Sequence, residues 1–230
     1  MSTKPVSSGH QRGDTGSHQH VLTETPEEIA YELRAAEGSL WTGSRLVVGI
    51  AVFALASLAF AYFYLRSSNN AQLWRPGDVT APSGTGAAIF AVTAAAGVLA
   101  IFGKMRLQRG LRVDWQVAGW TTVLGGLMAI GLQIWELTQL SFFPGSSGYA
   151  SCFIGWASMN IALLVGATYW METLLARSLR LRRALMEEGG NLTSPLPAER
   201  LFRANVEGCA FFWGFAAVAA GFFWLLFYVI

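Results

Sequence analysis

The sequence predicts an all-α integral membrane protein whose bundle contains five transmembrane helices. Three observations lead to this prediction: 53% of the residues are apolar, only 13% are charged, and the charged residues are concentrated between long apolar segments. Soluble globular proteins carry about 25% charged residues, so this composition favours a lipid environment.

The apolar segments have the length that a membrane requires. A hydrocarbon core about 30 Å thick needs about 20 apolar residues in helical form. Five segments meet this requirement within a transmembrane domain over residues 41–230, namely residues 46–65, 84–102, 115–140, 149–176 and 206–230. Small residues in the second and third, at 94–97 and at Gly125, Gly126 and Gly131, predict close helix–helix contacts.

Residues 1–40 form a polar N-terminal tail without the apolar core of a signal peptide. Its first 22 residues are rich in Ser, Gly, His and Gln and are expected to be disordered. Thr25, Pro26 and Glu28 then match a helix N-cap, a first helical position and a capping box. They predict a short helix near residues 26–37 that ends at Gly38.

Basic residues are concentrated on one side of the predicted membrane domain. They follow the second span (Lys104, Arg106, Arg109, Arg112) and the fourth span (Arg177, Arg180, Arg182, Arg183, Arg200, Arg203). The segment 141–148 and the C-terminal end contain none. By the positive-inside rule, the N-terminus is expected inside and the C-terminus outside.

The spans lack side chains that ligate redox metals. All three histidines, His10, His18 and His20, lie in the polar tail, and Cys152 and Cys209 are expected to be buried free thiols. No phosphate loop or nucleophile elbow occurs in the chain. We therefore expect no cofactor, no metal site and no catalytic residue of the chain's own, and no nucleic acid partner.

Acids and arginines supply the candidate polar sites. Glu136 lies within the third span, where it is either a proton-accessible site or, as we favour, hydrogen-bonded to a neighbouring helix. Glu207 is expected to be solvated or to pair with Arg200 or Arg203. The arginines set the topology or contact anionic lipid headgroups. The candidate lipid-binding or structural residues are Glu136, Glu207, Arg106, Arg109, Arg200 and Arg203.

Residues 61–67, 131–142, 148–153 and 206–213 carry short motifs that, in order and in register over about residues 42–230, resemble those of the cytochrome c oxidase subunit III family. Residues 61–67, AYFYLRS, resemble the family's AAYFYxRS, and GLQIWE at 131–136 with LSF at 140–142 is similar to GLQAYEY and LSF. GYASCF at 148–153 takes the place of YGSxFF, and VEGCAFFW at 206–213 resembles FEAAAWYW. The five predicted spans match the family's short form.

The chain also departs from the family pattern. Ala51 stands where the family usually has a glutamate, and residues 155–160 lack the histidines of GxHGxHV. Residues 213–220 lack the His and Asp of WHFVDVVW. An inherited role in proton uptake is therefore not expected, and the resemblance favours packing, lipid binding and stability of a complex.

The resemblance implies a non-catalytic accessory subunit of a haem-copper terminal oxidase in aerobic respiration, located in the bacterial inner membrane. Its partners would be the catalytic subunit I and subunit II of the oxidase, which hold haem and copper. A phospholipid would bind in an interhelical cleft. Two alternatives to the oxidase subunit remain. One is an accessory protein of a nitric oxide reductase, and the other is a small proton-coupled transporter that uses Glu136. A membrane anchor that recruits a partner through the N-terminal tail is a further one.

Overall fold

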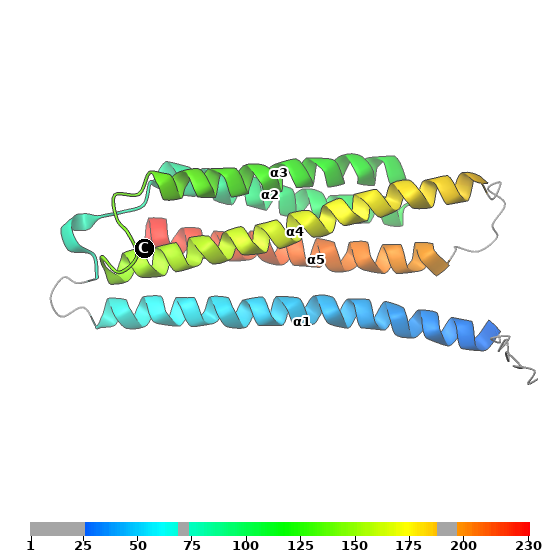
Figure 1. The fold of residues 1–230 in the computed structure, drawn as a ribbon, viewed down its shortest axis with the longest axis horizontal. Helices are drawn as coiled ribbons and strands as arrows, with labels where there is room; N and C mark the ends of the chain where they lie inside the picture. The colour runs from blue at the N-terminus through cyan, green and yellow to red at the C-terminus, as the bar shows by residue number, and fades with distance from the viewer. Residues whose placement is uncertain (1–25, 69–73, 188–196) are drawn as a thin grey trace, which may run out of the picture.

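The computed structural model describes residues 26–68, 74–187 and 197–230 of the chain. In these residues all regular structure is helical, which confirms the all-α prediction. The helices are α1 (Pro26–Ser67), α2 (Ser83–Gln108), α3 (Arg112–Thr138), α4 (Gly148–Glu187) and α5 (Pro197–Trp224) (Figure 1). A short 3₁₀ turn, Pro76–Asp78, precedes α2, and a C-terminal π turn, Leu225–Val229, follows α5.

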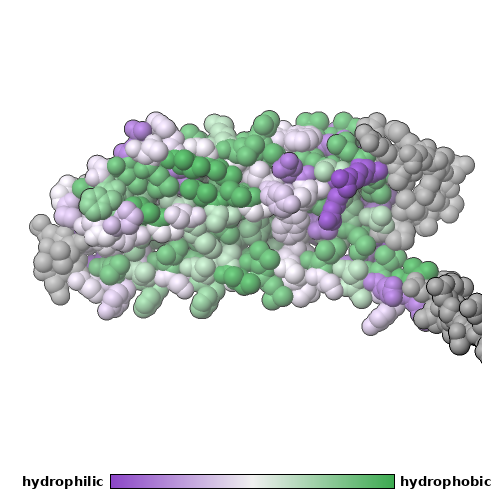
Figure 2. Space-filling view, in the orientation of Figure 1, coloured by the Kyte–Doolittle hydropathy of each residue, from purple (hydrophilic) through white to green (hydrophobic). Residues whose placement is uncertain are grey.

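Five helices are long and apolar enough to cross a membrane, so the chain is a multi-pass membrane protein. Apolar side chains cover much of the visible surface along the middle of the bundle (Figure 2). Phe53 and Phe60 on α1 and Leu124 on α3 are among the exposed large side chains. In water such a surface would be costly, whereas in a bilayer it faces lipid or another membrane protein.

The prediction of a separate helix ending at Gly38 is wrong, because α1 runs from Pro26 to Ser67 without a break. A glycine inside a helix costs only about 1 kcal/mol relative to alanine, and a long apolar segment that is helical in the membrane offsets this cost. Gly38 has no neighbour that would meet an added side chain. The predicted N-cap, Thr25, and the segment expected to be disordered lie outside the described residues.

Helices α2, α3, α4 and α5 form a four-helix bundle around Trp213, which is fully buried. Small residues make room for this side chain and its helix. A methyl group added at Gly97 would lie 3.0 Å from the Trp213 carbonyl oxygen, and one at Gly126 would overlap Thr168. The close contacts predicted for Gly97 and Gly126 are therefore confirmed, whereas Gly131 faces open space.

Helix α1 lies along the outside of this bundle, where it packs on α5 and α4 (Figure 1). It approaches α5 closely where Ser44 meets Gly208, since a side chain at Gly208 would overlap the Ser44 hydroxyl. In the most apolar 18-residue stretch of α1 only 22% of the residues are buried, against 50% in the corresponding stretch of α5. Helix α1 is thus the most exposed of the five spans.

The two ends of the bundle differ in composition. One end, called the arginine-rich end below, carries the start of α1, the α2–α3 turn, the end of α4 and the start of α5 (Figure 1). The opposite end, called the aromatic end, contains a buried cluster of Tyr62, Trp74, Tyr149, Phe153 and Phe227.

The α2–α3 turn is built by a glycine. Gly110 has φ +81°, which a residue with a side chain rarely adopts. The Gly110 amide donates to the Leu107 carbonyl at 2.9 Å and the Leu111 amide to the Arg106 carbonyl at 3.0 Å, the two bonds of a Schellman motif. The turn places α3 beside α2 and brings Arg106, Arg109 and Arg112 to the same end of the bundle.

Candidate functional site: a groove between α1 and α2

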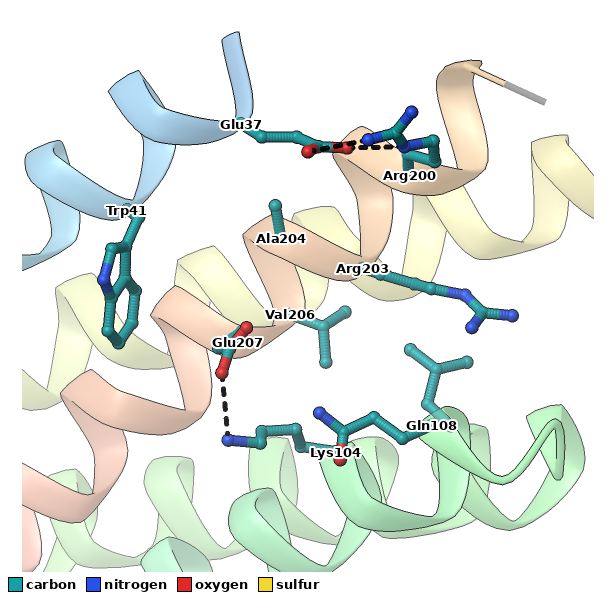
Figure 3. Close-up of a pocket in the computed structure, with 10 residues that line it drawn as sticks. Glu37, Trp41, Lys104, Gln108, Arg200, Arg203, Ala204, Val206 and Glu207 are labelled. Atoms are coloured by element: carbon teal, nitrogen blue, oxygen red, sulfur yellow. Dashed lines mark hydrogen bonds and ion pairs between the residues drawn. The ribbon is translucent and has the colours of Figure 1, made fainter. Parts of the chain in front are cut away.

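A groove opens between α1 and α2 at the arginine-rich end, and α5 forms its floor. Its outer part is a cavity of about 450 Å³ that reaches from Glu37 and Arg200 to Lys104 and Glu207 (Figure 3). A second cavity of about 590 Å³ shares Trp41, Lys104 and Glu207 with the first. We refer to the two connected cavities as the α1–α2 groove.

Ion pairs surround the outer part of the groove. The Lys104 ammonium lies 3.4 Å from the Glu207 carboxylate, and this pair connects α2 with α5. The Arg200 guanidinium contacts both oxygens of Glu37, at 2.8 and 3.1 Å, and this pair connects α5 with α1 (Figure 3). The polar end of the groove therefore presents positive and negative groups side by side.

The inner part of the groove is apolar. Its lining includes Val48 of α1, Ile101 of α2, and Phe211, Phe215 and Val218 of α5. From Arg203 to Val218 the floor helix rises by about 22 Å, at 1.5 Å per residue. One leaflet of a bilayer core is about 15 Å thick, so the groove is long enough for an acyl chain. It can hold an amphiphile with its headgroup at the ion pairs.

Three of the predicted polar residues meet at the groove. Glu207, Arg200 and Arg203 all line its outer part. Of the two alternatives predicted for Glu207, pairing with Arg200 or Arg203 is wrong, since its partner is Lys104, whereas the Glu207 side chain is 46% exposed to solvent. Arg203 instead lies 2.8 Å from Glu199, one turn earlier on α5, and extends away from the Lys104–Glu207 pair (Figure 3).

The other two candidate arginines lie outside the groove. Arg106 pairs with Asp114 at 3.6 Å across the α2–α3 turn, and its guanidinium stacks 4.7 Å from the centre of the Phe102 ring. Arg109 is exposed next to Gly110. Arg106 therefore stabilises the turn, and neither arginine lines the groove.

Glu136 belongs to a separate buried network. It is fully buried on α3, where Tyr228 of the C-terminal π turn donates a hydrogen bond to one carboxylate oxygen at 2.7 Å. Gln133, one turn earlier, donates to the other oxygen at 2.6 Å. The Asn160 side chain of α4 donates to the side-chain amide oxygen Oε1 of Gln133 at 3.0 Å. The network joins α3, α4 and the C-terminus, as expected for a carboxyl group that holds a bundle together.

Sequence reasoning missed several residues of these two sites. Glu37 was placed only in the short helix predicted near residues 26–37, and Lys104 was treated as a topology signal, although both line the groove. Gln133, Asn160 and Tyr228 were not singled out. A usable signal existed for Gln133, because a polar residue three positions before an intramembrane acid lies on the same helix face.

The described residues of these sites offer charged groups and hydrogen-bonding groups. Within the described part of the chain, no group of three or more His, Cys, Asp or Glu side chains is arranged to hold a metal ion. Cys152 and Cys209 are both buried free thiols, as predicted. Comparison of the chain with models of known protein families and with curated protein sequences found no match.

Proposed function

We propose that the chain is a non-catalytic accessory subunit of a haem-copper terminal oxidase, which stabilises the catalytic subunit and holds a phospholipid in the α1–α2 groove. The observation that carries the lipid-binding part is the continuous lining of the groove, polar at the arginine-rich end and apolar over a length that fits one leaflet. The resemblance of four segments to the subunit III family supports the oxidase partner. Haem and copper would be held by the partner subunits.

In this proposal the arginine-rich end faces the cytoplasm, in agreement with the positive-inside rule. The headgroup of an inner-leaflet phospholipid would then lie among Lys104, Glu207 and the Arg200–Glu37 pair. Its phosphate and any ammonium group both find partners there, because the groove offers cations and carboxylates. One acyl chain would follow α5 toward Val218.

The membrane partner can be tested by purification from native membranes in a mild detergent through a tag on this chain. We expect the absorbance spectrum of haem and the co-purification of a catalytic oxidase subunit. A nitric oxide reductase as the co-purifying enzyme would replace the oxidase in the proposal. Recovery of the chain alone and without haem would contradict the accessory role.

The groove can be tested with a matched pair of glycine substitutions. Gly214 lines the groove, so Gly214→Leu places a side chain in it, whereas Gly131→Leu adds the same side chain where nothing lies within 4 Å. We expect Gly214→Leu to lower the phospholipid retained after delipidation by about one molecule per chain, and Gly131→Leu to leave it unchanged. Equal retention in both variants would contradict lipid binding in the groove.

A further inference from the structure

A second pocket lies on the other side of α5, between the end of α4 and the start of α5. Its volume is about 400 Å³, and its lining includes Arg177, Arg180, Leu181, Leu201, Phe202 and Asn205. On α5 these positions fall on the helix face opposite Arg200, Ala204, Glu207 and Phe211 of the groove, at 100° per residue. We refer to it as the α4–α5 pocket.

The two arginines of this pocket differ from five of the other basic residues at the same end. Lys104, Arg106, Arg112, Arg200 and Arg203 each form an ion pair. Arg177 and Arg180 are exposed, and the ion pairs of the described residues include neither. Because they are three positions apart on α4, their guanidinium groups lie on the same helix face.

The nearby acids do not balance this charge. Glu199, on the first turn of α5, accepts from Arg112 and Arg203, both at 2.8 Å. Glu172 of α4 is exposed, and its Cα lies about 7.5 Å along the helix from that of Arg177. The N-terminal end of α5 adds the positive end of its helix dipole at Ala198. Among the described residues, no ion pair therefore compensates the positive charge of Arg177 and Arg180 at this pocket.

The remaining wall of the pocket is apolar. Leu181 of α4 faces Leu201 and Phe202 of α5 across it. A soluble anion would need only the arginines, whereas an amphiphile would also bury part of its chain against these side chains. Guanidinium groups bind phosphate through paired charge-assisted hydrogen bonds, and basic pockets between transmembrane helices bind anionic headgroups.

We propose that the α4–α5 pocket binds the phosphate headgroup and the upper acyl chain of an anionic phospholipid. Arg177 and Arg180 contact the phosphate, Asn205 supplies a neutral hydrogen-bonding group, and Leu201 and Phe202 contact the first methylene groups. The groove differs because its lining contains both acids and bases. The α4–α5 pocket thus selects a lipid with net negative charge, whereas the groove accepts a lipid whose headgroup carries both charges. This selection does not depend on which enzyme the chain assembles with.

The test is a titration of the purified full-length chain in a neutral detergent, followed by native mass spectrometry. The probes are phosphatidylglycerol and phosphatidylcholine with identical acyl chains. We expect the double variant Arg177→Gln/Arg180→Gln to weaken phosphatidylglycerol binding at least about tenfold and to change phosphatidylcholine binding less than about twofold. Unchanged phosphatidylglycerol binding in this variant would overturn the proposal.

A charge-matched control separates a site from general attraction. Arg45→Gln/Arg109→Gln removes the same charge from exposed positions outside the pocket and is expected to change binding less than about twofold. An equal loss in both double variants would overturn the proposal, because it would indicate a diffuse field. Retention of normal elution on size-exclusion chromatography shows that each variant is folded.

A third variant distinguishes a lipid from a free anion. Leu201→Asn keeps both arginines but makes the apolar wall polar, so it is expected to weaken phosphatidylglycerol binding severalfold. Competition with inorganic phosphate is expected to be ineffective at millimolar concentration. Full displacement by inorganic phosphate, together with normal lipid binding by Leu201→Asn, would assign the pocket to a soluble anion and overturn the proposal.

Discussion

At the arginine-rich end, partly exposed ion pairs join the helices, whereas at the aromatic end buried hydrogen bonds do so. The Lys104–Glu207 pair has side chains that are 28% and 46% exposed, and cavities open beside it. Glu136 is fully buried, and Tyr228 and Gln133 satisfy both of its oxygens. The first kind of contact can exchange partners with a ligand at low cost, and the second cannot.

Tyrosine side chains close the aromatic end. The last carbonyl groups of a helix have no partner within the helix and need an external donor. The Tyr62 hydroxyl of α1 donates to the Leu226 carbonyl at 2.8 Å, and the Tyr149 hydroxyl of α4 donates to the Phe227 carbonyl at 3.0 Å. These bonds attach α1 and α4 to the C-terminal π turn. Stability is therefore expected to depend on this end, and ligand exchange on the other.

The largest expected effect is that of Glu136→Leu. It leaves the Tyr228 hydroxyl and the Gln133 amide without an acceptor, and we expect a loss of about 3 kcal/mol in the free energy of unfolding. Equilibrium unfolding in mixed micelles measures it. Glu207→Leu at the opposite end is the control, with an expected loss below about 1 kcal/mol because its ion pair is half exposed. Similar losses of unfolding free energy in the two variants would contradict the expected difference in stability between the two ends.

A smaller loss is expected from Tyr62→Phe. The ring stays in the aromatic cluster, but the Leu226 carbonyl loses its donor, which costs about 1 to 2 kcal/mol. Tyr64→Phe removes the same hydroxyl from a side chain that is 60% exposed, and it should change stability by less than about 0.5 kcal/mol. The same unfolding measurement compares the two, and equal effects would show that the hydroxyl bond does not stabilise the C-terminus.

The smallest expected effect is that of Glu37→Gln. It breaks the pair with Arg200 and should cost less than about 1 kcal/mol at low ionic strength, decreasing as salt is added. Tyr62→Phe should show no such salt dependence, because its hydrogen bond is buried and uncharged. Unfolding at two salt concentrations tests both statements. A loss of unfolding free energy in Glu37→Gln that is large and independent of salt would contradict this prediction, because it would show that the contacts at the arginine-rich end are as rigid as those at the aromatic end.

Much of the fold was accessible from the sequence, while the sites were accessible only in part. The spans follow from local hydropathy, and the close contacts at Gly97 and Gly126 follow from residue size. The continuation of α1 through Gly38 did not follow, because the stabilising apolar segment begins several residues later. The Lys104–Glu207 pair did not follow either, since Lys104 is far from Glu207 in sequence and adjacent to it only after α2 packs on α5.

The sequence by itself determined the number of transmembrane helices, the end at which basic residues gather, and the absence of histidine from the spans. Each of these properties depends only on the composition of a continuous stretch of sequence, because every membrane-spanning segment must satisfy its own backbone hydrogen bonds within the lipid. The tertiary structure alone decided the groove, the Glu136 network and the α4–α5 pocket, whose two arginines form no ion pair with the described residues. Each depends on how far a helix is rotated about its axis and which helix lies beside it, and hydropathy carries no information about either.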